Sequence, residues 1–125
     1  MTTALIRYFT YFLALQKCKN SSDYSIHGLW IDYAKGGYPE FCHRTNFNSS
    51  ELAPINNRLN NVWKSCWGGN EGLWEHEWKK HGTCFEQNYT LIEYFNKTLN
   101  LYDENYPFKQ CNKQECLIQV YKERN

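Results

Sequence analysis

The amino-acid sequence predicts an α+β fold, in which an antiparallel sheet packs against helices. Disulfides are expected to cross-link this single domain, which spans residues 1–125. Three observations support this prediction. The length of 125 residues fits one domain with its own hydrophobic core. Some segments are rich in β-branched and aromatic residues, whereas others carry apolar residues at helical spacing. The six cysteines are an even number, consistent with three disulfides among 15 possible pairings.

Three strands are predicted. Residues 6–15 are rich in β-branched and aromatic side chains, which favours a buried strand. Residues 1–16 could instead form a secretory signal peptide, but Arg7 interrupts the apolar run and no small-residue cleavage site follows. We therefore favour the strand. Residues 25–30 predict a short strand followed by a loop over 31–38, and residues 118–121 predict a closing strand.

Three helices are predicted between the second and the last strand. In residues 52–67 the apolar side chains recur at steps of three and four, which indicates an amphipathic helix with Ser49 or Ser50 as its N-cap. The other two helices are predicted over residues 74–83 and 91–101.

The composition excludes several classes of protein. No run reaches the ~18 consecutive apolar residues that a membrane-spanning helix needs. The aromatic content of 18% is too high for a disordered chain. The formal net charge of +1 excludes a broadly basic nucleic-acid-binding surface, so any polyanion must be bound by a local cluster of charges.

Glycosylation signals and cysteines together favour the secretory pathway. The sequence Asn-X-Ser/Thr occurs at Asn20, Asn48, Asn88 and Asn96. No two cysteines form a CxxC pair, which argues against a zinc ribbon and against a thioredoxin-type redox site. Disulfides persist in oxidising compartments, so both features point outside the cytosol.

Titratable side chains are concentrated in two segments, IHGLW at 26–30 and WEHEWKKHGTC at 74–84. On a helical wheel the second segment presents two imidazoles, a carboxylate and an ammonium within about 140° of arc. These are His76, Lys80, Glu77 and His81. Trp74 and Trp78 lie on the adjacent face, where they would anchor the helix in the core.

Two other interpretations of this helix compete with a catalytic one. A zinc helix places its histidines four residues apart on one face, whereas His76 and His81 are five apart, and the neighbouring lysines would repel a dication. We therefore expect no metal. The second alternative is an ordinary exposed helix with pairs such as Glu75 and Lys79, and the helix alone does not decide against it.

A reaction mechanism connects this helix with His27. Cleavage of RNA by its own 2′-hydroxyl needs a base, an acid for the leaving 5′-oxygen, and cations around the phosphorane. Two imidazoles on opposite sides of a phosphate, with a lysine and a third imidazole nearby, meet these needs. The substrate supplies its own nucleophile, so neither a metal nor a cofactor is required.

The two segments resemble the active-site segments of the ribonuclease T2 family of secreted acid ribonucleases, in sequence and in order. The resemblance implies that His27 is the general acid and His81 the general base. It implies that Glu77 and Lys80 stabilise the phosphorane and that His76 binds the phosphate. The products would be 2′,3′-cyclic phosphates and then 3′-phosphates, formed with low base specificity.

The resemblance also implies a base-binding site and two disulfides. Trp30, Asp32 and Tyr38 would bind one base, and the less favoured alternative is that they are core aromatics and a turn aspartate. The implied disulfides are Cys42–Cys84 and Cys18–Cys66, and Cys111 and Cys116 would pair by default. The sequence departs from the family pattern at Ile31, where a proline is usual, and in lacking a long stretch between Tyr106 and Cys111.

These observations predict a metal-independent endoribonuclease that acts on single-stranded RNA as a ribonuclease T2-like domain. We expect a monomer that binds no membrane and that is secreted or lies in the lumen of an acidic organelle, lysosome or vacuole. The first alternative is a catalytically impaired secreted RNA-binding or signalling protein on the same fold. The second is an unrelated disulfide-linked glycoprotein. His43 belongs to neither segment and receives no role.

Overall fold

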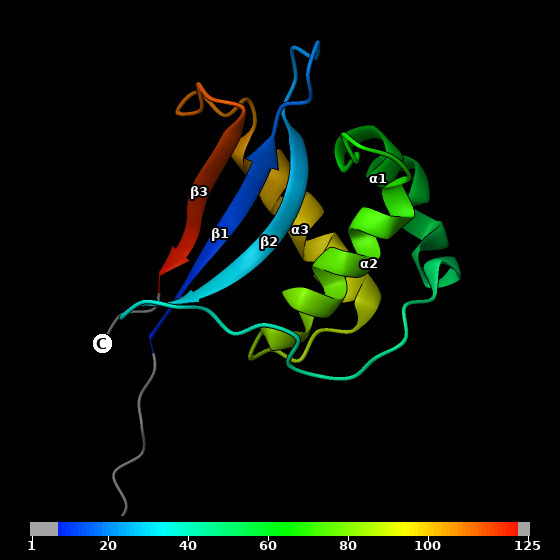
Figure 1. Ribbon diagram of the computed structural model, residues 1–125, viewed down its shortest axis with the longest axis vertical. Coiled ribbons are helices and arrows are strands. Elements are labelled where there is room, and N and C mark those ends of the chain that lie inside the picture. The colour runs from blue at the N-terminus through cyan, green and yellow to red at the C-terminus, as the bar shows by residue number, and fades with distance from the viewer. Residues whose placement is uncertain (1–7, 123–125) are drawn as a thin grey trace, which may run out of the picture.

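The computed structural model describes residues 8–122, and it contains a three-stranded antiparallel sheet and three α-helices (Figure 1). The strands are β1 (Phe9–Gln16), β2 (Ser25–Tyr33) and β3 (Glu115–Lys122), in the order β2-β1-β3. The helical elements are η1 (Ser49–Ile55), α1 (Asn56–Val62), α2 (Asn70–Lys80), η2 (Gly82–Cys84) and α3 (Leu91–Asn105). The α+β architecture predicted from the sequence is confirmed.

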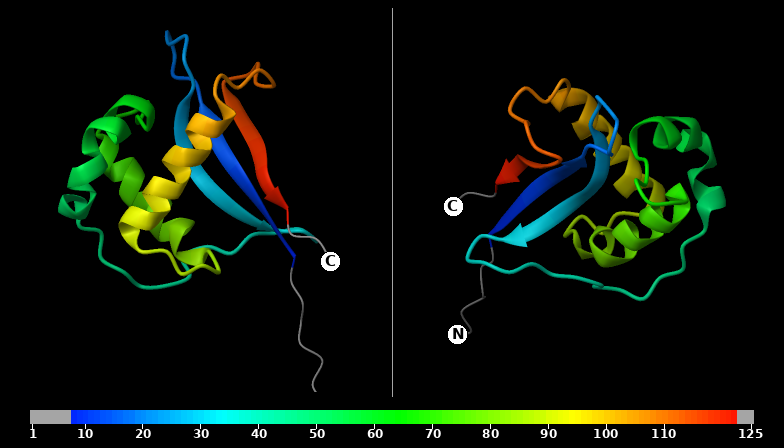
Figure 2. Two further views of the ribbon diagram at one scale, coloured as in Figure 1. Left: turned by 180° about the vertical axis from the view of Figure 1, so that it is seen from behind. Right: turned by 45° about the horizontal axis from the view of Figure 1, so that its top comes forward.

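The helices lie on one side of the sheet. Helix α3 crosses behind the strands, and α2 and α1 lie beyond β2, as the view from behind also shows (Figure 2). Within residues 8–122, no helix covers the opposite face of the sheet. None of the described helices is long and apolar enough to cross a membrane.

Strand β1 is the central strand, since it pairs with β2 on one side and β3 on the other, and most of its apolar residues are buried. Leu13, which is fully buried, pairs with Leu29 on β2 and with Ile118 on β3. The predicted strand is confirmed from Phe9 onward, and residues 1–7 lie outside the described part of the chain. A bulge in β2 leaves His27 opposite no β1 residue, between the paired residues Ile26 and Gly28.

Strand β2 is longer than predicted. It continues to Tyr33, so the loop expected over residues 31–38 begins later. The reason is that Ile31 is fully buried and pairs with Tyr11, which extends the ladder beyond Trp30. Strand β3 is also longer than the predicted residues 118–121, because it pairs with nearly the whole of β1.

The helix predicted over residues 52–67 is wrong in its boundaries. A 3₁₀ segment precedes α1, and its N-cap is Asn48, whose side chain accepts a hydrogen bond from the Ser50 amide at 3.1 Å, not Ser49 or Ser50. The α-helix ends at Val62, and Trp67 is 96% exposed instead of facing the core.

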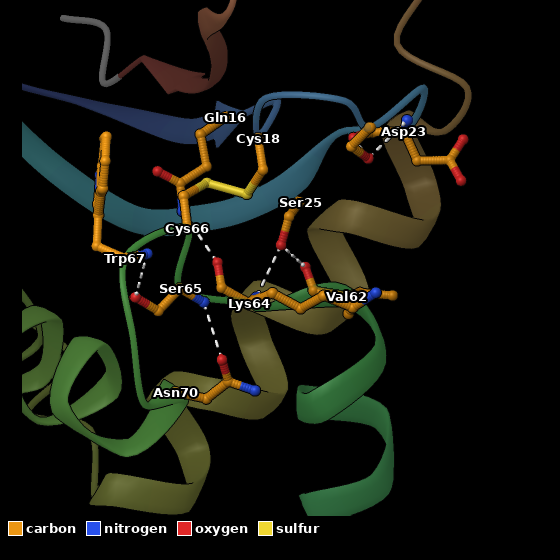
Figure 3. The surroundings of a disulfide bond; sticks show 11 residues. Gln16, Cys18, Asp23, Ser25, Val62, Lys64, Ser65, Cys66, Trp67 and Asn70 are labelled. Atoms are coloured by element: carbon orange, nitrogen blue, oxygen red, sulfur yellow. Dashed lines mark hydrogen bonds between the residues drawn. A yellow bond between two sulfur atoms is a disulfide. The ribbon is translucent and has the colours of Figure 1, made fainter.

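The early end of α1 has a clear cause in β2. The Ser25 hydroxyl donates to the Val62 carbonyl at 2.9 Å and accepts from the Lys64 amide at 2.8 Å, which turns the chain toward the sheet (Figure 3). The Cys18–Cys66 disulfide then joins this turn to the segment after β1.

The other two helices exist as predicted with shifted ends. Helix α2 begins at Asn70 and ends at Lys80, so it starts before the predicted Trp74 and does not reach Thr83. Beyond it the chain tightens into the 3₁₀ turn η2, in which Gly82 packs directly on Trp78, where a Cβ would lie 2.4 Å from the indole. Helix α3 begins at a Thr90–Glu93 capping box and continues to Asn105.

The core brings the sheet and helices together around large aromatic side chains. Trp74 and Trp78 are buried, as the wheel predicts, at 1% and 6% exposure. The Tyr94 hydroxyl donates to the Leu29 carbonyl at 2.9 Å, which ties α3 to β2. All cysteines are paired, as Cys18–Cys66, Cys42–Cys84 and Cys111–Cys116, so the disulfides implied by the resemblance are present.

Candidate active site

A cavity of about 310 Å³ lies between β2 and α2. We call it the catalytic pocket. Its lining contains every residue for which the sequence predicts a catalytic or base-binding role, together with one residue from β3. The lining residues are His27, Trp30, Asp32, Tyr38, His76, Glu77, Lys80, His81 and Leu117.

Glu77 lies at the centre of the pocket between the two histidines expected to transfer protons. Its Oε2 is 3.6 Å from His27 Nε2, and its Oε1 is 3.9 Å from His81 Nε2. Its Oε1 also accepts a hydrogen bond from the Trp30 indole at 2.7 Å. The carboxyl group is 1% exposed, so it contacts the protein much more than water.

The approach of Glu77 to β2 depends on Gly28. A Cβ at this position would lie 2.1 Å from Glu77 Oε1 and 2.7 Å from Trp30 Nε1. Any larger residue would therefore force the Glu77 carboxyl group or the Trp30 indole to shift. The adjacent bulge places His27 beside this close contact, and the Trp63 indole donates to the His27 carbonyl at 3.0 Å.

Burial changes the protonation of the central pair. It raises the pKa of Glu77 to about 7, although the Trp30 hydrogen bond and the charge of Lys80 act in the opposite direction. Burial lowers the pKa of His81 to about 3, and three neighbouring cationic side chains act in the same direction. The His81 imidazole is therefore neutral in mild acid, while Glu77 titrates near neutral pH.

The other groups complete the electrostatics of the pocket. Burial lowers the pKa of His27, and the Glu115 carboxylate on β3 opposes this effect. The His81 Nδ1 is buried and has no hydrogen-bond partner among the described residues. An unpaired buried polar atom destabilises the fold by about 1–3 kcal/mol, so it calls for an explanation, of which a role in catalysis is one.

Lys80, His76 and Tyr38 lie at the rim of the pocket. The Lys80 ammonium is 3.9 Å from a Glu40 carboxylate oxygen and 5.7 Å from the centre of the Tyr38 ring. His76 is exposed on the surface of α2. These groups are thus placed where a phosphate could enter from solvent.

The residues with predicted base contacts differ in their surroundings. Trp30 stacks on the His81 imidazole with the ring centres 5.0 Å apart, and its indole N–H is bonded to Glu77. Tyr38 is 48% exposed and carries no such bond to the pocket. Asp32 lies on β2 in the pocket wall, and burial raises the pKa of its carboxyl group.

Sequence analysis did not identify Leu117 as a pocket residue. It is 55% exposed on β3 and pairs with Ala14 on β1, which in turn pairs with Gly28 on β2. These pairings across the three strands place Leu117 of β3 beside the pocket. No local signal marks Leu117, because its place depends on strand order.

The fold and the pocket together define a disulfide-linked α+β protein with two histidines around a buried carboxyl group. Residues 8–121 match the family model described as the ribonuclease T2 family, which covers most of the chain. The chain therefore belongs to the ribonuclease T2 family.

Similarity to individual proteins agrees with this assignment. Ribonuclease 1 of Arabidopsis thaliana is 40% identical over 87 residues, which cover 66% of this chain and 38% of that protein. Ribonuclease DdI of Dictyostelium discoideum is 36% identical over 88 residues, covering 69% of this chain and 40% of that protein. A crystal structure of RNase NT in complex with 5′-AMP superposes with a TM-score of 0.66 and 27% identity, covering 82% of this chain and 58% of that one. The chain thus spans less than half the length of these two curated relatives.

Proposed function

We propose that the protein is an endoribonuclease that cleaves single-stranded RNA by transphosphorylation, without a metal ion or cofactor. The observation that carries the proposal is the convergence of His27 and His81 on the two oxygens of one buried carboxyl group. Membership of the ribonuclease T2 family supports ribonuclease activity. The chain is proposed to act as a single domain.

In the first step, neutral His81 accepts the proton of the 2′-hydroxyl, whose oxygen attacks the phosphorus. His27 donates a proton to the 5′-oxygen as the P–O5′ bond breaks, which leaves a 2′,3′-cyclic phosphate. Lys80 and His76 bind the phosphate oxygens, where negative charge develops. Glu77 lies with its carboxyl oxygen 3.9 Å from His81, where its carbonyl dipole in acid, and its negative charge as the pH rises toward its pKa of about 7, stabilise the imidazolium that forms on His81.

In the second step the two histidines exchange roles. His27 takes a proton from water, the water oxygen attacks the cyclic phosphate, and His81 returns its proton to the 2′-oxygen. The product then ends in a 3′-phosphate. The low pKa of His81 suits this return, because its imidazolium is a strong acid.

Base binding is proposed at the open side of the pocket. Tyr38 supplies an exposed ring on which any base can stack, and such a stack contributes about 1–3 kcal/mol to binding. Asp32 and Trp30 complete this site in the adjacent wall. Because stacking dominates, we expect low base specificity.

The environment of the protein is proposed to be extracellular or the lumen of an acidic organelle. The three disulfides require oxidising conditions, and Asn20, Asn48, Asn88 and Asn96 are all exposed. The protein is proposed to be a monomeric glycoprotein.

The proposal is tested by incubating the purified protein with a single-stranded RNA oligomer at pH 5 in EDTA and measuring the product ends by mass spectrometry. Fragments that end in 2′,3′-cyclic phosphate would support both the reaction and its independence of metal. Intact RNA, with the protein folded by circular dichroism, would refute it. The catalytically impaired RNA-binding protein would then be the better assignment.

A further inference from the structure

A second groove, of about 600 Å³, lies next to the catalytic pocket. We call it the strap groove, because most of its lining comes from residues 34–48, the segment that runs from β2 past the end of α2 (Figure 1). Its lining residues are Phe41, His43, Arg44, Thr45, Asn46 and Lys79. The catalytic machinery described above uses none of them.

The two cavities lie closest where Phe41, in the lining of the strap groove, contacts His76, in the lining of the catalytic pocket. On α2, Lys79 and Lys80 are the residues three and four positions after His76, so they lie on either side of it on the helix surface. Lys80 lines the catalytic pocket, and Lys79 lines the strap groove. A chain that extends from the catalytic pocket past His76 would therefore enter the strap groove.

Phe41 stands at this boundary and is fixed there. Its ring is 56% exposed, with its centre 6.4 Å from that of His76. Its backbone has a φ of 49°, a left-handed conformation that a bulky residue keeps only when its surroundings impose it. The Phe41 amide donates to the Lys80 carbonyl at 2.9 Å, and the next residue forms the Cys42–Cys84 disulfide.

The charges in the strap groove fit a polyanion. Arg44 is exposed and has no hydrogen-bond or ion-pair partner in the described part of the chain. Lys79 is bound to Glu75 at 2.6 Å, but no carboxylate belongs to the described lining of the groove. The chain as a whole has a formal charge of only +1, so this cluster is a local feature. A guanidinium binds phosphate through paired hydrogen bonds, and an exposed ring stacks on a base.

We propose that the strap groove is an accessory subsite for single-stranded RNA, in which Phe41 stacks on a base outside the cleaved dinucleotide and Arg44 and Lys79 bind its phosphate. The substrate class rests on the proposed function. The subsite adds binding energy that a dinucleotide cannot use, so longer RNA binds more tightly.

The test measures binding of 2′-O-methyl oligonucleotides, which lack the attacking hydroxyl and are not cleaved. Fluorescence anisotropy compares a dinucleotide with an octanucleotide for the full chain, for Arg44→Glu, and for the control Lys97→Glu. Lys97 is exposed on α3 and lines neither cavity, so the control has the same change of charge.

We expect Arg44→Glu to weaken octanucleotide binding about tenfold, because it replaces a phosphate-binding guanidinium with a like charge. The slope of log K against log salt should fall by about 0.7, the loss of one phosphate contact on a single strand. Dinucleotide binding should not change, and Lys97→Glu should alter octanucleotide binding by less than about twofold. Phe41→Ala should weaken octanucleotide binding through the loss of stacking.

Equal effects of Arg44→Glu and Lys97→Glu would overturn the subsite, and so would equal binding of dinucleotide and octanucleotide to the unmodified protein. The binding measurement needs no cleavage of RNA. Its result therefore tests the accessory subsite independently of the proposed catalytic function. If RNA is not cleaved but Arg44-dependent binding persists, the subsite stands and the catalytic function is wrong.

Discussion

At the scale of single residues, the catalytic pocket depends on titratable side chains that lie within 4 Å of one buried carboxyl group. Glu77 contacts His27, His81 and Trp30 at once because it is buried against a glycine. The sequence was sufficient to propose these side chains, since they cluster in two short segments. It could not reveal that Trp30 covers His81, because the two residues belong to different elements.

His81 is proposed as the general base, so His81→Phe should reduce RNA cleavage by about 10²–10⁴-fold, the usual contribution of a positioned acid–base group. Circular dichroism and thermal unfolding should show a folded protein, because a ring of similar shape still packs under Trp30. Cleavage rates at pH 5 give the readout. Activity close to that of the unmodified protein, in a folded variant, would refute the role.

Gly28→Ala should impair both stability and activity. The added methyl group would meet Glu77 Oε1 at 2.1 Å, and overpacking of this kind destabilises a core by about 1–3 kcal/mol. Gly72→Ala is the matched control, because a Cβ there meets no atom within 4 Å and Gly72 lies in α2, where alanine is the better helix former. Urea denaturation and cleavage assays should separate the two variants. Equal stability of both would show that Glu77 moves away freely.

The pH dependence of stability follows from the raised pKa of Glu77. Burial raises this pKa from the ordinary 4.5 to about 7, so the folded protein binds the proton more tightly than the unfolded chain does. The contribution of protonated Glu77 to the free energy of unfolding is fully present below about pH 4.5 and is lost as the pH rises toward 7. Burial of His81 acts in the opposite direction between about pH 3 and 6.5, where its stabilisation is lost as the pH falls.

Glu77→Gln isolates the first effect, because glutamine resembles the protonated carboxyl group at every pH. We expect the variant to gain stability relative to the unmodified protein between pH 4.5 and pH 7, by about 1–3 kcal/mol. Denaturation midpoints of both proteins at the two pH values measure this gain. A constant difference between the proteins would mean that Glu77 titrates below this range.

At the scale of secondary-structure elements, the sequence predicted which elements exist better than where they end. The sequence patterns located the three α-helices and the three strands, because they reflect burial along one face, but they did not predict the 3₁₀ segments η1 and η2. The end of α1 depends on Ser25, which binds the chain beyond Val62 and lies on a different element. The exposure of Trp67 has the same origin, since the helix that would have buried it has already stopped.

The disulfides should differ in their contributions to these elements. Cys42–Cys84 closes a segment with a sequence separation of 42, whereas the separation for Cys111–Cys116 is 5. The chain-entropy model therefore predicts that Cys42→Ser/Cys84→Ser costs about 2 kcal/mol more than Cys111→Ser/Cys116→Ser. Thermal unfolding of the two double variants gives the comparison. The reverse order of stabilities would indicate that the segment of residues 34–48 keeps its position without the Cys42–Cys84 bond.

At the scale of the whole molecule, the catalytic pocket is built from residues of both the sheet and the helices. Leu117 near the end of the chain reaches the same cavity as His27 near its beginning, through β1. The sequence could not predict this, because strand order is a property of the complete fold. The short stretch between Tyr106 and Cys111 is compatible with the pocket, since β3 still pairs with β1.

This arrangement predicts one cooperative unfolding transition. The buried residues of the sheet and of α2 and α3 form a single cluster, so neither layer keeps its core without the other. Near-ultraviolet circular dichroism and cleavage activity, followed during heating, should lose signal at the same temperature. Separate midpoints would show that the helices and the sheet unfold independently.

The Cys42–Cys84 bond has a consequence for where activity can arise. It links the segment after β2, the strand that carries His27, to the turn that follows His81, and so it joins the two parts of the chain that carry the proposed proton-transfer groups. In a reducing cytosol the Cys42–Cys84 bond would not persist, so a newly made chain would lack the covalent link between these two parts of the chain. The proposed ribonuclease would then reach its active geometry only in an oxidising compartment, away from the RNA of the cytosol.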